Sequence, residues 1–260
     1  MTGRLSSYFI ENSQEEQSIK NLILTSEDWA FIGNAVAGFE NHGRFVVTND
    51  KSEVEYYRNM NQLLLHKATP LADIYTAERQ EEFQLLLERQ AKVVGERRTY
   101  LSEPPLHTIS DNLLNKILAD NKLSLEESEK IRSHVLQARR QITERLLKGK
   151  ITEFLPFMSE TDAKKHPPKL FLSDIFPNKY IYYTYPEYKQ HIDETFKFAA
   201  NTANYSCEPF EFPTFHNTRT IMDQGSGVFT SSNRIPSVHL AITHPKMCRL
   251  IERIPIFTRI

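Results

Sequence analysis

The stretch from His216 to Asn233 constrains the fold of this chain more than any other, because it has the pattern of two strands joined by a glycine turn. Polar and apolar side chains alternate before the turn, which is the period of a strand with two different faces. Residues 224–227 supply the turn, since glycine adopts positive φ at no steric cost. We therefore expect residues 217–223 and 227–232 to pair antiparallel, with residues 237–242 in the same sheet.

The rest of the chain predicts an α/β (or α+β) fold that is rich in helices, with a mixed sheet, flanking helices and a long central helix. The expected elements are two helices within residues 12–41, a strand at 44–48, and helices at 52–67, 76–98, 113–120, 125–149, 186–201 and 245–251.

Breaks in this pattern predict three parts. Residues 1–70 form a helix-strand-helix α/β unit, and residues 71–160 form a helical linker or dimerisation region. The Lys-His-Pro-Pro-Lys run at 165–169 is a stiff connector that cannot be helical. After it the chain becomes aromatic and β-prone, so residues 161–260 are expected to form an α/β sensor-like domain.

The expected long helix begins with a capping box, because Ser124 is followed by Glu127 three residues later. Its apolar residues form one narrow seam: Ile131, Val135, Ala138, Ile142 and Leu146. Its other faces are basic: Lys130, Arg132, Arg139, Arg140, Arg145, Lys148 and Lys150. A solvated outer face, a helical dimer seam and contact with nucleic acid are the three interpretations of this pattern.

Composition restricts the functional class. The formal net charge is -1, so no global field attracts DNA or a membrane surface. The sequence lacks an apolar run of membrane-spanning length and a signal-peptide core, so a cytoplasmic protein is expected. Cys207 and Cys248 are the only cysteines and form no Cys-x-x-Cys motif, which indicates two reduced thiols. The nine histidines are scattered, and no metal or cofactor motif occurs, so neither is expected.

Part of the opening stretch resembles the motif of phospholipase D-type phosphodiesterases. These enzymes carry a His, a Lys two residues later, an Asp seven residues after the His, and then Gly-Ser-x-Asn. His216, Asp223, Ser231 and Asn233 fall in register with that motif. The resemblance makes these four the catalytic residues if the protein is an enzyme. The position of the phosphate-gripping Lys holds Thr218, however, which implies that catalysis is absent.

Residues 185–254 also resemble the C-terminal region of bacterial helix-turn-helix transcriptional regulators that carry a sensor-like domain. The similarity rests on Asn204-Tyr205, Gly-Val-Phe at 227–229, Ser-Asn-Arg-Ile-Pro-Ser-Val at 232–238 and His-Pro-Lys-Met at 244–247. It implies a ligand-sensing and dimerisation region that acts as a homodimer, is not an enzyme and does not enter the membrane. DNA would be bound only through a separate N-terminal module that this chain does not contain.

The two resemblances together predict the ligand site. A small-molecule or anionic ligand is expected to bind at His216, Arg219, Ser231 and Asn233. The alternative function is that of a degenerate or unusual phospholipase D-like phosphodiesterase.

Overall fold

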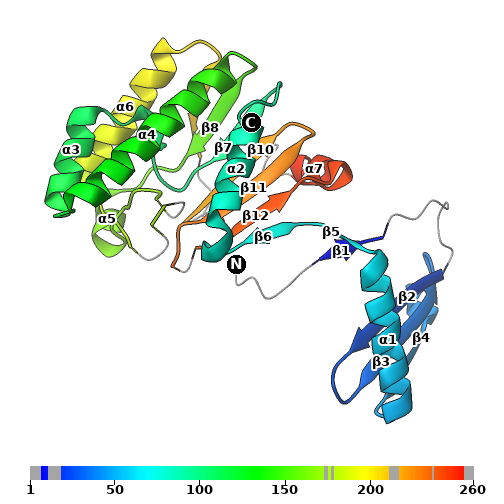
Figure 1. Cartoon of the computed structure of the whole chain (residues 1–260). Helices are drawn as coiled ribbons and strands as arrows, with labels where there is room; N and C mark the ends of the chain where they lie inside the picture. Colours follow the sequence, from blue (N-terminus) through cyan, green and yellow to red (C-terminus); the bar gives the residue numbers. More distant parts are fainter. Residues whose placement is uncertain are drawn as a thin grey trace. The chain divides into compact units, whose positions relative to one another are not determined.

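The computed structural model describes residues 7–10, 19–172, 175–176, 179–210, 217–235 and 237–254. It divides into two compact units, which are Ser6–Leu71 and a larger unit made mainly of Ala72–Ile260 (Figure 1). The end of the smaller unit lies beside the boundary expected at residue 70. The sheet of the larger unit takes strands from both sides of residue 160, where the sequence suggested a second boundary.

The smaller unit is a short antiparallel sheet with one helix. Its described strands pair in the order β2-β3-β4, and β1 pairs separately with β5. The helix α1 begins after Asp50, whose carboxylate accepts hydrogen bonds from the amides of Ser52 and Glu53. The core is small and consists of Ala30, Ile32, Val54 and Tyr57. The bounds are β1 Tyr8–Phe9, β2 Ile19–Thr25, β3 Ala30–Val36, η1 Glu40–His42, β4 Arg44–Thr48, α1 Lys51–Lys67 and β5 Thr69–Pro70.

The prediction of two helices within residues 12–41 is wrong, because residues 19–25 and 30–36 are paired strands. The prediction took Ser26 as the N-cap of a helix. Its hydroxyl accepts hydrogen bonds from the amides of Asp28 and Trp29, as it would at a helix N-terminus, but here it closes the turn of a hairpin. The strand at 44–48 and the helix that follows it are confirmed.

The larger unit is built on a mixed sheet of seven strands within the described residues, in the order β6-β12-β11-β10-β7-β8-β9. β7, β8 and β9 are parallel, and the remaining pairs are antiparallel. The strand bounds are β6 Asp73–Tyr75, β7 Arg97–Tyr100, β8 Ile151–Leu155, β9 Tyr205–Pro209, β10 Thr218–Asp223, β11 Gly227–Ser232 and β12 His239–Ile242. The expected hairpin and its third strand are confirmed: β10 pairs with β11, and β11 with β12.

Helices flank this sheet on both faces, as the sequence indicated (Figure 1). α7 packs on the face of Tyr100 and Met222, whereas α2 packs on the opposite face with Ile221 and Phe229. The connections between the parallel strands carry α3, α4 and α6, which lie together beside the sheet in Figure 1. The helix bounds are η2 Ala77–Arg79, α2 Gln80–Gln90, η3 Leu106–Thr108, α3 Asp111–Asp120, α4 Leu125–Leu146, α5 Glu160–Lys165, α6 Tyr185–Asn201 and α7 Pro245–Glu252.

Four strands of this sheet, β6, β7, β8 and β9, lie where the sequence predicted none. The helix predicted for residues 76–98 ends at Gln90, and β7 follows it. β8 falls within residues 150–168, which the sequence suggested as a boundary region. None of the helices in the described part of the chain has the length and apolar character needed to cross a membrane.

The long helix α4 has the predicted capping box at Ser124 and Glu127, but its apolar seam is used within the chain. Ile131 and Val135 are buried in the main core of the larger unit. Ala138 and Ile142 line a cavity, described below. The seam is therefore not a free dimer interface. The basic residues are not all solvated either, because the side chain of Arg145 is fully buried.

Candidate functional site

Charged and polar side chains occupy the centre of one face of the larger sheet, where apolar residues would be expected. The register aligns Ile221 of β10, Thr99 of β7 and Glu153 of β8 in one row across adjacent strands. Because side chains alternate along a strand, Arg219 and Arg97 lie on this same face. The sheet therefore presents two guanidinium groups and a carboxyl group to the helices that cover it.

A cavity of about 100 Å³ lies over this polar face. The sheet forms its floor, and α4, α2 and the segment after β7 contribute its other lining residues. The lining residues that carry polar side chains are Gln84, Arg97, Thr99, Glu103, His107, His134, Gln137, Gln141, Glu153 and Arg219. A cavity with convergent polar groups in a mostly apolar protein interior is the usual form of a small-molecule site.

Glu153 is the most deeply placed acid of the cavity. It is buried in the centre of β8 and accepts a hydrogen bond of 2.5 Å from Tyr205 Oη. Burial raises its pKa to about 7, although the Tyr205 hydrogen bond and the charges of Arg219 and Arg97 act in the opposite direction. Its carboxyl group can therefore gain or lose a proton near neutral pH.

His107 lies beside Glu153, with its Nε2 atom 3.8 Å from Glu153 Oε2. This distance is too long for a hydrogen bond, and no other described residue gives Nε2 a hydrogen-bond partner. Burial lowers the pKa of His107 to about 3, so its ring is neutral near pH 7. The imidazole packs edge-on against Phe198 and Tyr205. His107 thus presents a neutral ring nitrogen next to an ionisable carboxyl group.

Glu103 is a second buried acid on the cavity wall. It accepts hydrogen bonds from the hydroxyl of Ser102 and, at 3.2 Å, from Nδ2 of Asn233. Burial raises its pKa to about 7, and these two hydrogen bonds and the charges of Lys169 and Arg219 limit the rise. Lys169 is fixed nearby, because its ammonium group donates to the carbonyl oxygen of Asn233 at 2.6 Å.

Arg219 supplies the permanent positive charge of the site. Its guanidinium carbon lies 4.6 Å from the centre of the Phe171 ring, a cation–π contact that orients the planar group. Its charge acts on both Glu103 and Glu153. A guanidinium group does not lose its proton in proteins. The site therefore keeps this positive charge at physiological pH, whereas Glu103 and Glu153 can gain or lose a proton.

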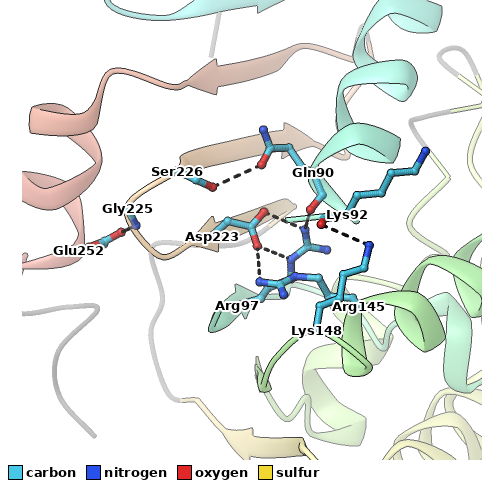
Figure 2. Close-up of polar contacts among 9 residues, drawn as sticks. All are labelled: Gln90, Lys92, Arg97, Arg145, Lys148, Asp223, Gly225, Ser226 and Glu252. Atoms are coloured by element: carbon cyan, nitrogen blue, oxygen red, sulfur yellow. Dashed lines mark hydrogen bonds and ion pairs between the residues drawn. The ribbon is translucent and has the colours of Figure 1, made fainter. Parts of the chain in front are cut away.

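One end of the polar face is fixed by a buried ion cluster (Figure 2). Arg97 donates to both carboxylate oxygens of Asp223, at 2.7 and 2.8 Å, and Arg145 of α4 donates to one of them at 3.2 Å. The side chains of Asp223 and Arg145 are fully buried. The cluster joins β7, β10 and α4 and carries one excess positive charge.

The structure brings together several of the residues that the sequence singled out. Arg219 lines the cavity, and Ser231 of β11 is paired with Arg219 in the strand register. Asn233 donates a hydrogen bond to Glu103. Asp223 belongs instead to the ion cluster with two arginines. His216 lies outside the described residues. Among the described positions of the phosphodiesterase-like motif, Asp223 is bound by Arg97 and Arg145, whereas Asn233 is bound to Glu103.

Sequence reasoning missed Glu103, His107 and Glu153, which complete the site. The available signal was a single acid in the middle of an otherwise uncharged, β-prone run, Ile-Thr-Glu-Phe-Leu at 151–155. Among the residues that the structure describes, no group of three potential ligands could hold a metal ion. Cys207 and Cys248 are both free thiols, and burial raises the pKa of Cys207 to about 12.

Comparison of the chain with models of protein families, with curated proteins and with solved structures finds no match. The interpretation of the cavity therefore depends on its own geometry.

Proposed function

We propose that the larger unit is a sensing domain that binds a small polar molecule in the cavity between the sheet and α4. In this proposal the protein is the ligand-sensing part of a bacterial transcriptional regulator, acts in the cytoplasm as a homodimer, and is not an enzyme. The observation that carries the ligand-binding part is the convergence of Arg219, Glu153 and Glu103 on one cavity. Well-packed apolar residues at buried charged positions are often neutral or stabilising, so a binding role accounts for the buried charges.

The regulator part of the proposal rests on the pattern of residues 185–254, which resembles that of the sensor region of such proteins. The absence of catalysis is supported by Thr218 at the position of the phosphate-binding Lys and by the engagement of Asp223 with Arg97 and Arg145. We expect purified protein to show no turnover of a generic phosphodiester.

A thermal-shift screen of the full chain against small metabolites tests ligand binding. The screen includes amino acids, carboxylates, amines, sugars and phosphates. A ligand present at about 100 times its Kd should stabilise the folded protein by about 2.7 kcal/mol. Arg219→Gln should abolish the shift. Arg98→Gln is the matched control, because Arg98 lies on the neighbouring strand with its side chain on the opposite face of the sheet. A shift that survives Arg219→Gln, or no shift with any compound, would contradict the proposal.

The regulatory part needs its own experiment. The full chain is fused behind a DNA-binding module that represses a reporter only when it is dimerised. Repression that changes when the screened ligand is added supports a sensing and dimerisation role. A fusion that never represses, together with sedimentation of the unfused protein as a monomer, would contradict the homodimer.

A further inference from the structure

We propose that the chain dimerises through the smaller unit, by the face of its three-stranded sheet that α1 does not cover, and that the partner is a second copy of this chain. The inference rests on the homodimer of the proposed function and names the surface that forms it. The apolar seam of α4 is used within the chain, so a homodimer needs a different surface.

The smaller unit exposes more apolar side chains than its size predicts. Ser6–Leu71 is about a quarter of the chain. Within the described residues, however, it holds more than half of the large hydrophobic side chains that are exposed. Single exposed apolar residues are normal on a protein surface, whereas a contiguous group of them marks an interaction site.

The strand register gathers such residues on one face of the sheet. Directly paired residues share a face, and the face alternates along each strand. Ala30 and Ile32 of β3 point to the face on which α1 lies, where they pack with Val54 (Figure 1). The opposite face, called the outer face below, consists of one row with Leu24, Phe31 and Val47 and a second row with Leu22, Gly33 and Phe45.

The outer face is open and carries no charged residue. Val47 is 67% exposed and Phe45 is 56% exposed. The Phe45 ring lies over Gly33, where an added Cβ would be 2.9 Å from the ring, and it stacks on Phe31 with 5.9 Å between the ring centres. A face of an antiparallel sheet that is solvated is commonly polar. The apolar outer face is therefore suited to a second protein surface.

The charge of the smaller unit disfavours two other classes of partner. Between residues 19 and 67, six acidic residues stand against five Lys and Arg residues. Binding to nucleic acid or to an anionic membrane depends on an excess of positive charge. An uncharged face instead fits another uncharged face, and a second copy supplies one of the same size and character.

Symmetry and area define the dimer further. A two-fold axis that lies between two sheets and parallel to them would stack the outer faces about 10 Å apart, with the same residues contributed by both copies. Three strands about 4.8 Å apart and five to seven residues long give a flat area of about 300 Å² per copy. Stable interfaces bury about 800 Å² per partner. The outer face alone therefore supports a weak, reversible dimer, with a Kd of about micromolar order.

Sedimentation of the full chain over a range of concentrations tests the inference. The wild type should pass from monomer to dimer as its concentration rises through the micromolar range. Val47→Lys should raise the Kd of the dimer by about tenfold or more, because an ammonium group would be buried without a partner. Val36→Lys is the matched control and should leave the Kd unchanged, since Val36 is 53% exposed on β3 and alternates to the α1 side of the sheet.

A second variant and a folding control keep the test independent of whether the lysine is tolerated. Leu24→Thr/Val47→Thr removes apolar surface from the outer face and keeps β-branched residues that suit a strand. It should also weaken the dimer. Trp29 is the only tryptophan and belongs to the smaller unit, so its fluorescence shows whether that unit stays folded in each variant.

The outcomes separate this inference from the proposed function. A dimer that forms equally well in both outer-face variants would overturn the inference and leave the homodimer standing on another surface. A wild type that stays monomeric well above the micromolar range would overturn both the inference and the homodimer. Monomeric wild type that binds neutral phospholipid vesicles, and loses this binding with Val47→Lys, would assign the outer face to a membrane and overturn the dimer.

Discussion

The buried cluster of Arg97, Asp223 and Arg145 allows a sharp test of how charge is balanced in the larger unit. Asp223 is the single anion of the cluster and accepts three hydrogen bonds, two from Arg97 and one from Arg145. Asp223→Ala would leave two guanidinium groups in the interior without their counter-ion. Removing one partner of a buried ion pair costs about 3–5 kcal/mol, so we expect the free energy of unfolding to fall by about 4 kcal/mol.

Arg145→Met should behave very differently. The Nε and Nη1 atoms of Arg145 have no hydrogen-bond partner within the described part of the chain, and its charge is the excess one. Methionine has a comparable length without the charge. Replacing a buried charge by a well-packed apolar side chain is often neutral or stabilising. The variant is therefore expected to lie within about 1 kcal/mol of the wild type.

The double variant tests whether Arg145 is excess charge or a partner that Asp223 requires. In the Asp223→Ala background, Arg145→Met removes one of two uncompensated charges and should restore about 2 kcal/mol. Urea unfolding followed by far-UV circular dichroism measures each free energy. Trp29 is the only tryptophan and belongs to the smaller unit, so its fluorescence is an internal control. If Arg145→Met lowered the free energy of unfolding as much as Asp223→Ala does, Arg145 would not be excess charge.

Three further changes test other parts of the structure. The pKa values of Glu103 and Glu153 are raised from 4.5 to about 7, so the folded protein keeps protons that the unfolded chain has lost between these pH values. Stability from these groups is therefore lost as the pH rises from about 4.5 to about 7. The Glu103→Gln/Glu153→Gln variant should exceed the wild type in urea midpoint above pH 7 and lose that advantage near pH 4.5. Ile131→Ala should cost about 3 kcal/mol in urea unfolding, because the side chain is fully buried in the core; a loss below about 1 kcal/mol would contradict this packing. Gly225→Ala should cost about 1–2 kcal/mol, since φ is +68° at this turn and the added Cβ meets open space; Gly225→Asn should cost less in the same measurement.

Features that depend on neighbouring residues were accessible from the sequence. The alternation before Gly225 and the turn residues around it predicted the β10–β11 hairpin correctly. The spacing of Ser124 and Glu127 predicted the beginning of α4 correctly. In each case the interacting groups lie within a few residues, so their pattern specifies the structure.

Features that depend on distant residues were not accessible. Ser26 makes the same side-chain hydrogen bonds in a hairpin turn as at a helix N-terminus, and only the pairing of β2 with β3 decides between them. β8 is buried on both faces and has no alternation to reveal it. The cavity combines residues from α2, β7, α4, β8 and β10, whose register no local pattern specifies. Arg219 was identified as a site residue, but Glu153 could be recognised only once the pairing of β8 with β7 placed it on the same face of the sheet as Arg219.

The two groups of buried charge in the larger unit differ in what they require. In the ion cluster Asp223 is fully engaged by arginines, so its role in joining β7, β10 and α4 needs no ligand. Around the cavity, by contrast, Glu153 and His107 approach each other without a hydrogen bond, and the permanent charge of Arg219 stands on the same lining. Proteins retain such locally unfavourable arrangements at functional sites. The ion cluster is therefore best understood as structural, and the cavity is the part of this fold in which we propose that a ligand binds.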